Sequence, residues 1–265
     1  MIVLSRRLDL VKINQRLPRK TDSDIPRDSH FRRLFDMNNS GQSKHNIYGE
    51  IFTRKGIHVL MANRGVETTF KGEFYTLSRH KKLLNAYINN FTFNFPELTS
   101  LTRVDICMDV LANSSSLSEV FNFKDGMTFK PKRGKCRASK FYSIGKSGEP
   151  QLSSLYVGSA VRFLNIYNKG VEVEENKNRS DGKYQYYKHI YGKETDLNKV
   201  FRVELRVMNR SYLKKHLQTV FDLNFGDLYT DLFSDFFNFY EVKTAKGNSH
   251  RQWQKLKKMV LAGTI

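Results

Sequence analysis

The sequence has few cysteines, few prolines and no long apolar run. Its two cysteines, Cys107 and Cys136, lack the spacing of zinc ligands and form no disulfide framework. Five prolines and 16 glycines in 265 residues argue against a long linker. No apolar run approaches the roughly 18–20 residues that span a bilayer, and the apolar stretch at the start is too short for a signal peptide. We therefore expect a cytoplasmic protein without a membrane partner.

Acidic residues are also scarce. Lysine and arginine number 45 against 26 aspartates and glutamates, which gives a net charge of +19. A charge of this size opposes compaction, so we expect a partner that neutralises it. Nucleic acid is the usual partner of such a chain, and an anionic lipid surface is the alternative. The 20 Phe and 13 Tyr can fill a hydrophobic core. The length of 265 residues indicates one large domain, with or without a small additional one.

Strand-like alternation dominates the middle of the chain, and helical spacing dominates its end. Alternating runs occur at 57–63, 66–77, 101–110, 127–169 and 200–208, whereas helical patterns occupy 80–91, 114–121 and the chain from Ser211 onward. Residues 173–198 are charged and rich in tyrosine, and we interpret them as a loop. We predict an α+β fold: a central antiparallel-rich β-sheet with helices packed on one side and a helical C-terminus.

Three of the predicted strands, LTRVDICMDV, FLNIYNK and VFRVELRVM, have the same polarity. Successive side chains of a strand point to opposite faces, so each has one apolar face and one face of charged or reactive groups. These groups are Arg103, Asp105, Cys107, Asp109, Tyr167, Lys169, Arg202, Glu204 and Arg206. For any one strand, the ordinary interpretation is a solvated face whose carboxylates pair with arginine. If the strands are neighbours, carboxylates, a tyrosine and cations converge on one surface.

Such a surface has coherent chemistry. Carboxylates hold Mg²⁺ or Mn²⁺, and an ion of this kind neutralises charge on a reacting phosphate. A tyrosine hydroxyl beside a cation becomes a better nucleophile. Asp105 and Asp109 lie about 13 Å apart along an extended strand, so they are not expected to ligate one ion together. Glu204 comes from another strand, and we expect it to act with Asp105 while Asp109 is a further ligand or orients an arginine.

The same segments resemble the Rep_trans family of rolling-circle initiators and related relaxases. LTRVDICMDV resembles the family's "TRLDLAFD"-type strand. FYSIGKSGEPQLSSLYVGSAVRFLNIYNKGVE resembles a longer stretch of the family, which has a glycine turn, a "Y-x-G" strand and the motif "R-F-x-x-I-Y-N-K-x-x-E". VFRVELRVM resembles the family's "WRVEIEL" strand. Order and spacing agree over about residues 100–216, with weaker similarity from about 57 and near 247–260.

The resemblance implies a tyrosine nicking enzyme. The nucleophile that stays on the 5′ phosphate and leaves a 3′-OH falls on Tyr167, with Lys169 beside it. The family's acidic positions fall on Asp105, Asp109, Glu204 and Glu172, of which the first three are expected to bind Mg²⁺ or Mn²⁺. DNA-binding positions are expected at Arg103, Arg162, Arg202, Arg206, Lys255, Lys257 and Lys258. Together with the polar, basic composition of the first residues, this predicts a basic N-terminal arm with one short strand or helix (1–46), a nicking domain (47–216) and a helical C-terminal DNA-binding extension (217–265) in one compact unit.

Several alternatives stay open. Plasmid members of the family carry an origin-specificity segment near the C-terminus, whereas this sequence ends soon after HRQWQKLKKM. This basic segment is predicted to be a helix that either binds DNA or packs on the core through Trp253. No His-x-His pair is present, which separates the chain from initiators with paired histidine ligands. The alternative function is a non-catalytic DNA-binding regulator. A tyrosine recombinase is disfavoured because Tyr167 is expected in a strand. A host helicase, a host polymerase and a second copy of the chain are the other expected partners.

Overall fold

The computed structural model describes residues 1–16, 38–39, 50–54, 57–62, 65–71, 99–121, 128–131, 137–144, 150–178, 183–222, 224–244 and 246–262. The chain divides into two compact units. Unit 1 contains residues 1–7, 106–207 and 225–265, and unit 2 contains residues 8–105 and 208–224. These divisions differ from the predicted boundaries at 46/47 and 216/217. The helix predicted over 80–91 and the turns predicted at 132–135 and 146–150 fall wholly or mostly outside the described residues.

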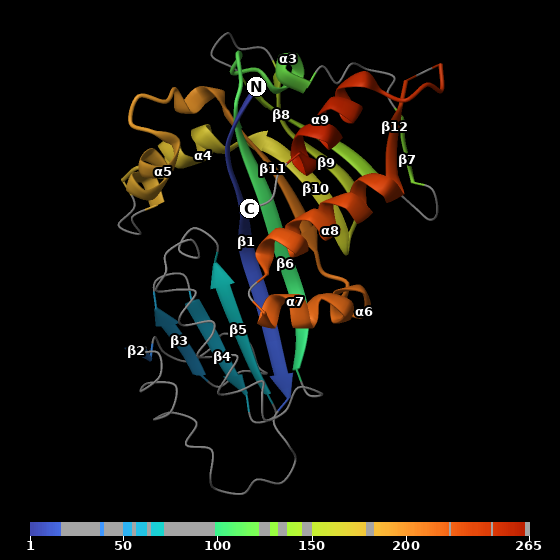
Figure 1. Ribbon diagram of the computed structural model, residues 1–265. Helices are drawn as coiled ribbons and strands as arrows, with labels where there is room; N and C mark the ends of the chain where they lie inside the picture. The colour runs from blue at the N-terminus through green and yellow to red at the C-terminus, as the bar shows by residue number, and fades with distance from the viewer. Residues whose placement is uncertain are drawn as a thin grey trace, which may run out of the picture. The chain divides into compact units, whose positions relative to one another are not determined.

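Unit 1 is built on an antiparallel sheet (Figure 1). Five neighbouring strands run in the order β6 (Thr99–Leu111), β11 (Val200–Val207), β10 (Arg162–Asn168), β9 (Pro150–Ser159) and β8 (Arg137–Ile144). A separate pair joins β7 (Thr128–Pro131) to β12 (Tyr240–Lys243). The helices of this unit are α3 (Leu117–Phe121), α4 (Lys169–Glu175), α5 (Lys183–Tyr191), α8 (Phe225–Phe239) and α9 (Arg251–Leu261), with a 3₁₀ turn, η4, at Leu197–Lys199. The predicted α+β class with a helical C-terminus is confirmed.

Unit 2 contains strands from the first part of the chain. Antiparallel pairs link β2 (Asn38–Asn39), β3 (Glu50–Arg54), β4 (Ile57–Ala62), β5 (Gly65–Lys71) and β1 (Ile2–Arg16) in that order. Its helical segments are α6 (Arg210–Leu213), η5 (Lys214–His216) and α7 (Leu217–Phe221). The N-terminal arm, predicted to hold one short strand or helix, has a long strand over its first part. The predicted loop at 173–198 is wrong, because α5 and the end of α4 occupy much of it.

The core of unit 1 lies between the apolar sheet face and α8. Alternate positions of β10 and β11, such as Leu164 and Leu205, are fully buried. The buried residues of α8 recur at helical spacing and are mostly aromatic: Phe225, Leu228, Tyr229, Leu232, Phe233, Phe236 and Phe237. Helix α9 docks on this core through Trp253, whose ring centroid lies 5.1 Å from that of Phe237 and whose indole N–H donates to Tyr240 O at 3.3 Å. Each large apolar side chain buried here contributes roughly 1.5–3 kcal/mol.

The strand β10 passes directly into helix α4 within the sequence IYNKG. Asn168 is the N-cap, and its Oδ1 accepts from Val171 N at 2.9 Å while its amide donates to Asn198 O at 2.6 Å. Gly170 packs so tightly that a Cβ there would lie 1.6 Å from Leu197 O. The strand therefore ends at Asn168, and Lys169 is a helical residue instead of the strand residue that the alternation predicted. This junction fixes the place of Tyr167.

Replacing Gly170 with alanine should destabilise the protein. The added methyl group collides with backbone atoms, which cannot rotate away as a side chain could, so we expect a loss of about 1–3 kcal/mol in the free energy of unfolding. Urea denaturation followed by circular dichroism measures it. Val171→Ala is the matched control, because Val171 is the next residue and is exposed. Equal stability of Gly170→Ala and Val171→Ala would contradict the tight packing of α4 against Leu197.

Candidate active site around Tyr167

Three adjacent strands of unit 1 align their side chains in rows on one sheet face. The antiparallel register of β10 with β9 and β11 places Tyr167 opposite Arg202 and Asn165 opposite Glu204. Since directly opposed residues share a face, the rows on this face are Ser154–Tyr167–Arg202, Tyr156–Asn165–Glu204 and Gly158–Phe163–Arg206. The structure thus brings Tyr167, Glu204, Arg202 and Arg206 together, as the alternation of the two strands indicated.

Tyr167 and Glu204 form a direct hydrogen bond. The Tyr167 hydroxyl donates to Glu204 Oε2 at 3.2 Å, and Arg206 Nη2 donates to Oε1 of the same carboxylate at 3.0 Å. Glu204 is buried, whereas Tyr167 and Arg206 are partly exposed. The carboxylate is therefore held in place by a cation while its second oxygen faces the phenol. A carboxylate in this position can orient the hydroxyl and accept its proton.

Lys169 adds a buried positive charge near Tyr167. Its ammonium donates to Glu172 Oε1 at 2.7 Å and lies 6.0 Å from the centre of the Tyr167 ring. It also lies 4.9 Å from the centre of the Tyr187 ring, so an aromatic face replaces part of its hydration. The first residue of α4 therefore brings a cation to the nucleophile candidate, and Glu172 and Tyr187 hold it there.

Beside this pair lies a fully buried charge cluster centred on Asp109. Arg202 donates to Oδ1 through Nε at 2.7 Å and to Oδ2 through Nη2 at 3.0 Å. Oδ2 also accepts from Arg7 Nη2 at 2.8 Å and from the Tyr191 hydroxyl at 2.7 Å. The Arg202 guanidinium donates in addition to the Tyr187 hydroxyl at 3.1 Å. Strands β1, β6 and β11 and helix α5 thus meet at one carboxylate.

The electrostatics of this cluster keep Asp109 ionised. Burial by itself would raise the pKa of Asp109, but the attraction of Arg202 and Arg7 and the hydrogen bonds from Arg202 and Tyr191 outweigh it and hold the pKa well below its usual range. Burial, and secondly the charge of Asp109, raises the pKa of the Tyr191 hydroxyl, so Tyr191 remains a donor. The cluster is a permanent buried ion group.

The prediction of an open charged face is wrong at six of its nine positions, because Asp105, Cys107, Asp109, Lys169, Arg202 and Glu204 are buried. Asp105 is 1% exposed, Asp109 0% and Arg202 1%. Because both oxygens of Asp109 are engaged by arginine, Asp109 orients cations instead of offering a metal ligand. Arg202 is fully engaged with Asp109 and Tyr187, so it is not placed to contact DNA phosphate.

The remaining predicted site residues have varied surroundings. Asp105 accepts from Arg103 Nε at 2.8 Å, and both residues lie in unit 2. Because Glu204 lies in unit 1, the predicted pairing of Asp105 with Glu204 stays a prediction. Arg162 is on the opposite face of β10 from Tyr167, where its guanidinium lies 4.8 Å from the centre of the Phe239 ring. Within the described residues, no group of three His, Cys, Asp or Glu side chains could hold a metal ion.

The basic positions of α9 divide into two kinds. Lys255 and Lys258 are exposed on the outer side of the helix, while Lys257 donates to Asn238 Oδ1 at 2.9 Å. Trp253 is fully buried on the inner side. The helix is therefore docked by its apolar side and presents lysines on the other, so the two interpretations of this segment are compatible.

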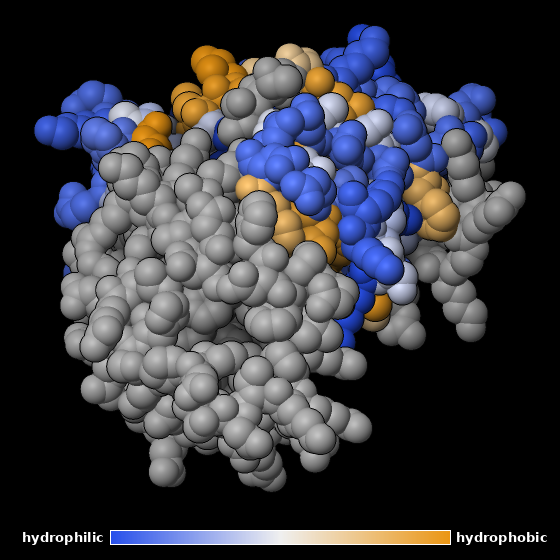
Figure 2. Space-filling view, turned by 60° about the horizontal axis from the view of Figure 1, so that its bottom comes forward, coloured by the Kyte–Doolittle hydropathy of each residue, from blue (hydrophilic) through white to orange (hydrophobic). Residues whose placement is uncertain are grey.

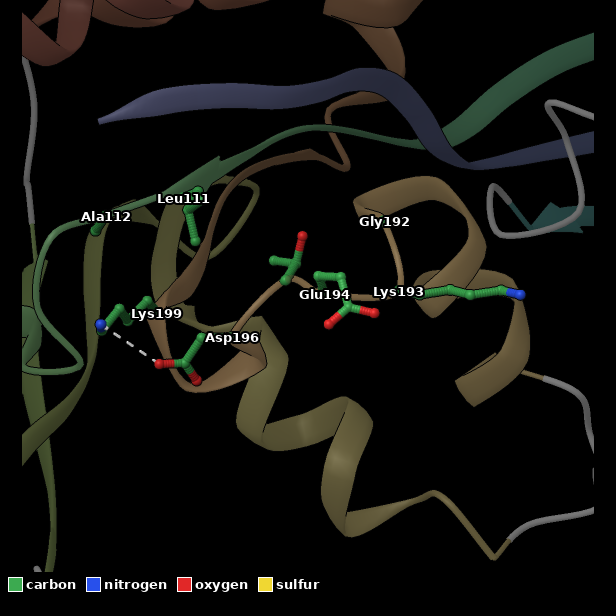
Figure 3. Close-up of a pocket in the computed structure, with 8 residues that line it drawn as sticks. Leu111, Ala112, Gly192, Lys193, Glu194, Asp196 and Lys199 are labelled. Atoms are coloured by element: carbon green, nitrogen blue, oxygen red, sulfur yellow. Dashed lines mark ion pairs between the residues drawn. The ribbon is translucent and has the colours of Figure 1, made fainter.

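Two surface features complete the description. In Figure 2, hydrophilic residues cover most of the coloured surface, and hydrophobic residues form smaller patches. A shallow hollow, shown in Figure 3, is lined by Leu111, Ala112, Gly192, Lys193, Glu194, Thr195, Asp196 and Lys199. None of the predicted catalytic residues lines it. Among the described helices, none is long and apolar enough to cross a membrane.

Sequence reasoning missed Arg7, Tyr187 and Tyr191 as parts of the site. Arg7 is 102 residues from Asp109, and the tyrosines fall in a segment interpreted as a loop. The one available signal was the tyrosine spacing itself, because residues 187 and 191 are four apart and share a face of a helix.

Comparison with known proteins identifies a structural relative. The fold is similar to the solved structure of the rolling circle replication initiator protein from Geobacillus stearothermophilus, with a TM-score of 0.60 and 13% sequence identity over 97% of both chains. No protein-family model matches the sequence, and no curated protein sequence matches it. At this identity the likeness concerns the fold: an antiparallel five-stranded sheet with helices and a helical C-terminus.

The charge of Asp109 should carry a large part of the acid stability. The pKa of Asp109 is lower in the folded protein than in the unfolded chain, where it is about 3.9. The stabilisation of the fold by the Asp109 charge is therefore fully present above about pH 3.9 and is lost as the pH falls below that value. Asp109→Asn leaves two buried arginines without a counterion, so we expect a loss of about 3–5 kcal/mol at neutral pH and a weaker pH dependence in acid. Urea denaturation at several pH values measures both.

The control for this experiment is Asp222→Asn, because Asp222 is exposed and its carboxylate accepts from the nearby Gln218 Nε2 at 2.8 Å. That variant should leave the stability nearly unchanged. An Asp109→Asn protein as stable as the control at neutral pH would contradict the role assigned to the buried cluster.

Proposed function

We propose that the protein is a replication initiator or relaxase that nicks one strand of DNA through Tyr167. The hydrogen bond between the partly exposed Tyr167 hydroxyl and the buried Glu204 carboxylate is the observation that carries this proposal. It is supported by the fold likeness to a rolling circle replication initiator and by the net charge of +19. DNA is the proposed substrate, with a single-stranded scissile region and flanking duplex.

The proposed reaction is a transesterification. The Tyr167 oxygen gives up its proton, for which Glu204 is the nearest described acceptor, and attacks the phosphorus. The bond from phosphorus to the 3′ oxygen breaks, and that oxygen takes a proton to become the 3′-OH. The 5′ phosphate stays on Tyr167, so the phosphodiester energy is conserved and the strand can be rejoined or transferred. Arg206 and Lys169 supply positive charge near the phosphate, which stabilises the transition state.

A divalent ion, Mg²⁺ or Mn²⁺, is the proposed cofactor. Glu204 fits as a ligand because its carboxylate lies beside the nucleophile. Asp109 does not fit, and Asp105, whose two carboxylate oxygens both accept from Arg103, stays a prediction as the second ligand. When bound, the ion would neutralise charge on the phosphate oxygens. A host polymerase that extends the 3′-OH, a host helicase and a homodimer stay predictions of the family resemblance.

A non-catalytic DNA-binding regulator is the second candidate. It is favoured by the lack of a three-carboxylate group among the residues that the structure describes. The two candidates differ in whether the protein nicks DNA and whether that nicking requires the Tyr167 hydroxyl.

Tyr167→Phe should abolish nicking and leave DNA binding intact. The substitution removes only the hydroxyl, so no covalent route remains while the ring still packs on the sheet. We expect nicking of supercoiled DNA that carries candidate origin sequences to fall by about 10³-fold or more, since the covalent step is lost. Mapping the protein-linked end should place the protein on the 5′ phosphate. Tyr212→Phe, in another part of the chain, is the control and should nick normally.

Nicking by Tyr167→Phe at a near-normal rate would exclude Tyr167 as the nucleophile. Absence of nicking by the unaltered protein, together with normal DNA binding in Mg²⁺, would favour the regulator.

Glu204→Gln should weaken metal binding. The substitution preserves the size of the side chain and an oxygen for the Tyr167 hydroxyl but removes the negative charge, so we expect the affinity for Mn²⁺ to fall at least about tenfold. Calorimetric titration of the metal-free protein with Mn²⁺ measures this independently of nicking. Glu241→Gln is the control, because Glu241 pairs with Lys243 in the separate two-stranded sheet. Unchanged Mn²⁺ affinity in Glu204→Gln would remove Glu204 from the metal site.

A further inference from the structure

An aromatic and cationic group lies on the same sheet face as Tyr167. The ring centroids of Tyr156 on β9 and Phe163 on β10 lie 5.8 Å apart, and the Arg206 guanidinium on β11 lies 5.2 Å from the Phe163 centroid. All three side chains are partly exposed, unlike the fully buried aromatics of α8. Arg206 is directly opposite Phe163 and Tyr156 is its diagonal neighbour, so the three planar groups lie on three adjacent strands, β9, β10 and β11. Figure 1 shows these strands side by side.

The strand residue opposite Phe163 carries no side chain. Gly158 is the β9 residue directly opposite Phe163, with φ of +141°. A Cβ at Gly158 would lie 2.3 Å from Arg162 O and 2.7 Å from Phe163 Cα, so the position excludes a side chain. No side chain therefore covers Phe163 from this opposed position.

Asn165 lies between the aromatic row and the nucleophile candidate. Phe163, Asn165 and Tyr167 are successive residues on one face of β10, so about 13 Å separates the first from the last along the strand. The Asn165 Oδ1 is buried and has no hydrogen-bond partner among the residues that the structure describes. A buried acceptor without a partner costs free energy, so a rotation of the partly exposed Asn165 side chain that brings Oδ1 to a donor on a ligand would be favoured.

We propose that Tyr156, Phe163 and Arg206 form a base-stacking subsite for single-stranded DNA, with the Asn165 carboxamide at the base edge. The inference rests on the proposed function, because it assigns this surface to nucleotides next to the phosphate at Tyr167. Aromatic rings stack on unpaired bases, and a guanidinium stacks on the same faces while attracting phosphate. A base within a duplex has both faces covered by its neighbours, so the subsite selects unpaired strand.

The position of Arg206 couples this subsite to the reacting pair. Its Nη2 donates to Glu204 Oε1 while its Cζ lies over the Phe163 ring. A base that stacks on the row therefore contacts a residue that holds the Glu204 carboxylate. The alternative is a cross-strand aromatic contact that only stabilises the sheet. The two differ in one measurable property, which is whether DNA binding depends on the presence of bases.

The test compares two fluorescent oligonucleotides of about 16 nucleotides, near the upper site size of a single-strand-binding module. One is oligothymidylate, and the other is an abasic strand with the same phosphates. Anisotropy titrations use the full chain in EDTA, so that no cleavage is required. We expect the unaltered protein to prefer oligothymidylate. Phe163→Leu should reduce that preference by about 5- to 140-fold, which corresponds to 1–3 kcal/mol per stacked base.

Matched variants separate stacking from charge and from folding. Phe163→Tyr keeps a ring and should keep the preference. The double variant Lys255→Gln and Lys258→Gln removes exposed cations of α9 and should weaken binding of both oligonucleotides by the same factor. In the unaltered protein, ultraviolet crosslinking of an oligonucleotide containing 5-iodouracil should label Tyr156 or Phe163, which tests the subsite even if Phe163→Leu does not fold.

Equal affinity of the unaltered protein for the two oligonucleotides would overturn the proposal, as would an unchanged preference in folded Phe163→Leu or crosslinks confined to other residues. These outcomes are independent of nicking. Base-dependent binding without nicking would support the subsite and refute the proposed enzyme. Nicking together with base-independent binding would support the enzyme and refute the subsite.

Discussion

The buried ion group around Asp109 is the constraint on which the rest of unit 1 depends. One carboxylate on β6 binds two arginines and a tyrosine, and these come from two further strands and a helix. Arg202 is the cross-strand neighbour of Tyr167, so the group that positions Arg202 also positions the nucleophile candidate. Breaking such a group by removing one member is costly, because the remaining charges stay buried without a partner. The site is therefore tied to the most strongly constrained part of the unit.

Aromatic rings make the excess of positive charge in this group tolerable. Two arginines and Lys169 surround Tyr187, at 5.0, 5.5 and 4.9 Å from its ring centre. The negative ring face replaces part of the water that these cations lose on burial. Together with Arg206, these cations surround Tyr167 with positive charge, and Glu204 and Glu172 pair with Arg206 and Lys169 respectively. Positive charge of this kind attracts an anionic group.

Local patterns predicted much of the fold and part of the site. The period-two alternation of β10 and β11 placed Tyr167 and Glu204 on one face, because side-chain direction in a strand is set by neighbouring residues alone. Exposure could not be predicted in this way, since it depends on what covers a face. Helix α5 covers Asp109 and Arg202, yet its sequence KYQYYKHIY is too polar to be recognised as a helix by apolar spacing. The contact of Arg7 with Asp109 has no local signal at all.

The interleaved composition of unit 1 has a consequence for synthesis of the protein. Arg6 donates to Met259 O at 3.0 Å, and Tyr229 donates to Val260 O, so the first strand and the helix α9 belong to one packed unit. A chain grows from its N-terminus, and domains fold as units when their last segments emerge. Residues 251–261 form α9 and are among the last to leave the ribosome. Packing of unit 1, which includes the start of β1 and the Asp109 group, is therefore complete only after they have emerged. A fragment that ends before residue 251 would carry Tyr167, Glu204 and the Asp109 group but would lack the helix whose Trp253 and Val260 complete the packing of the unit.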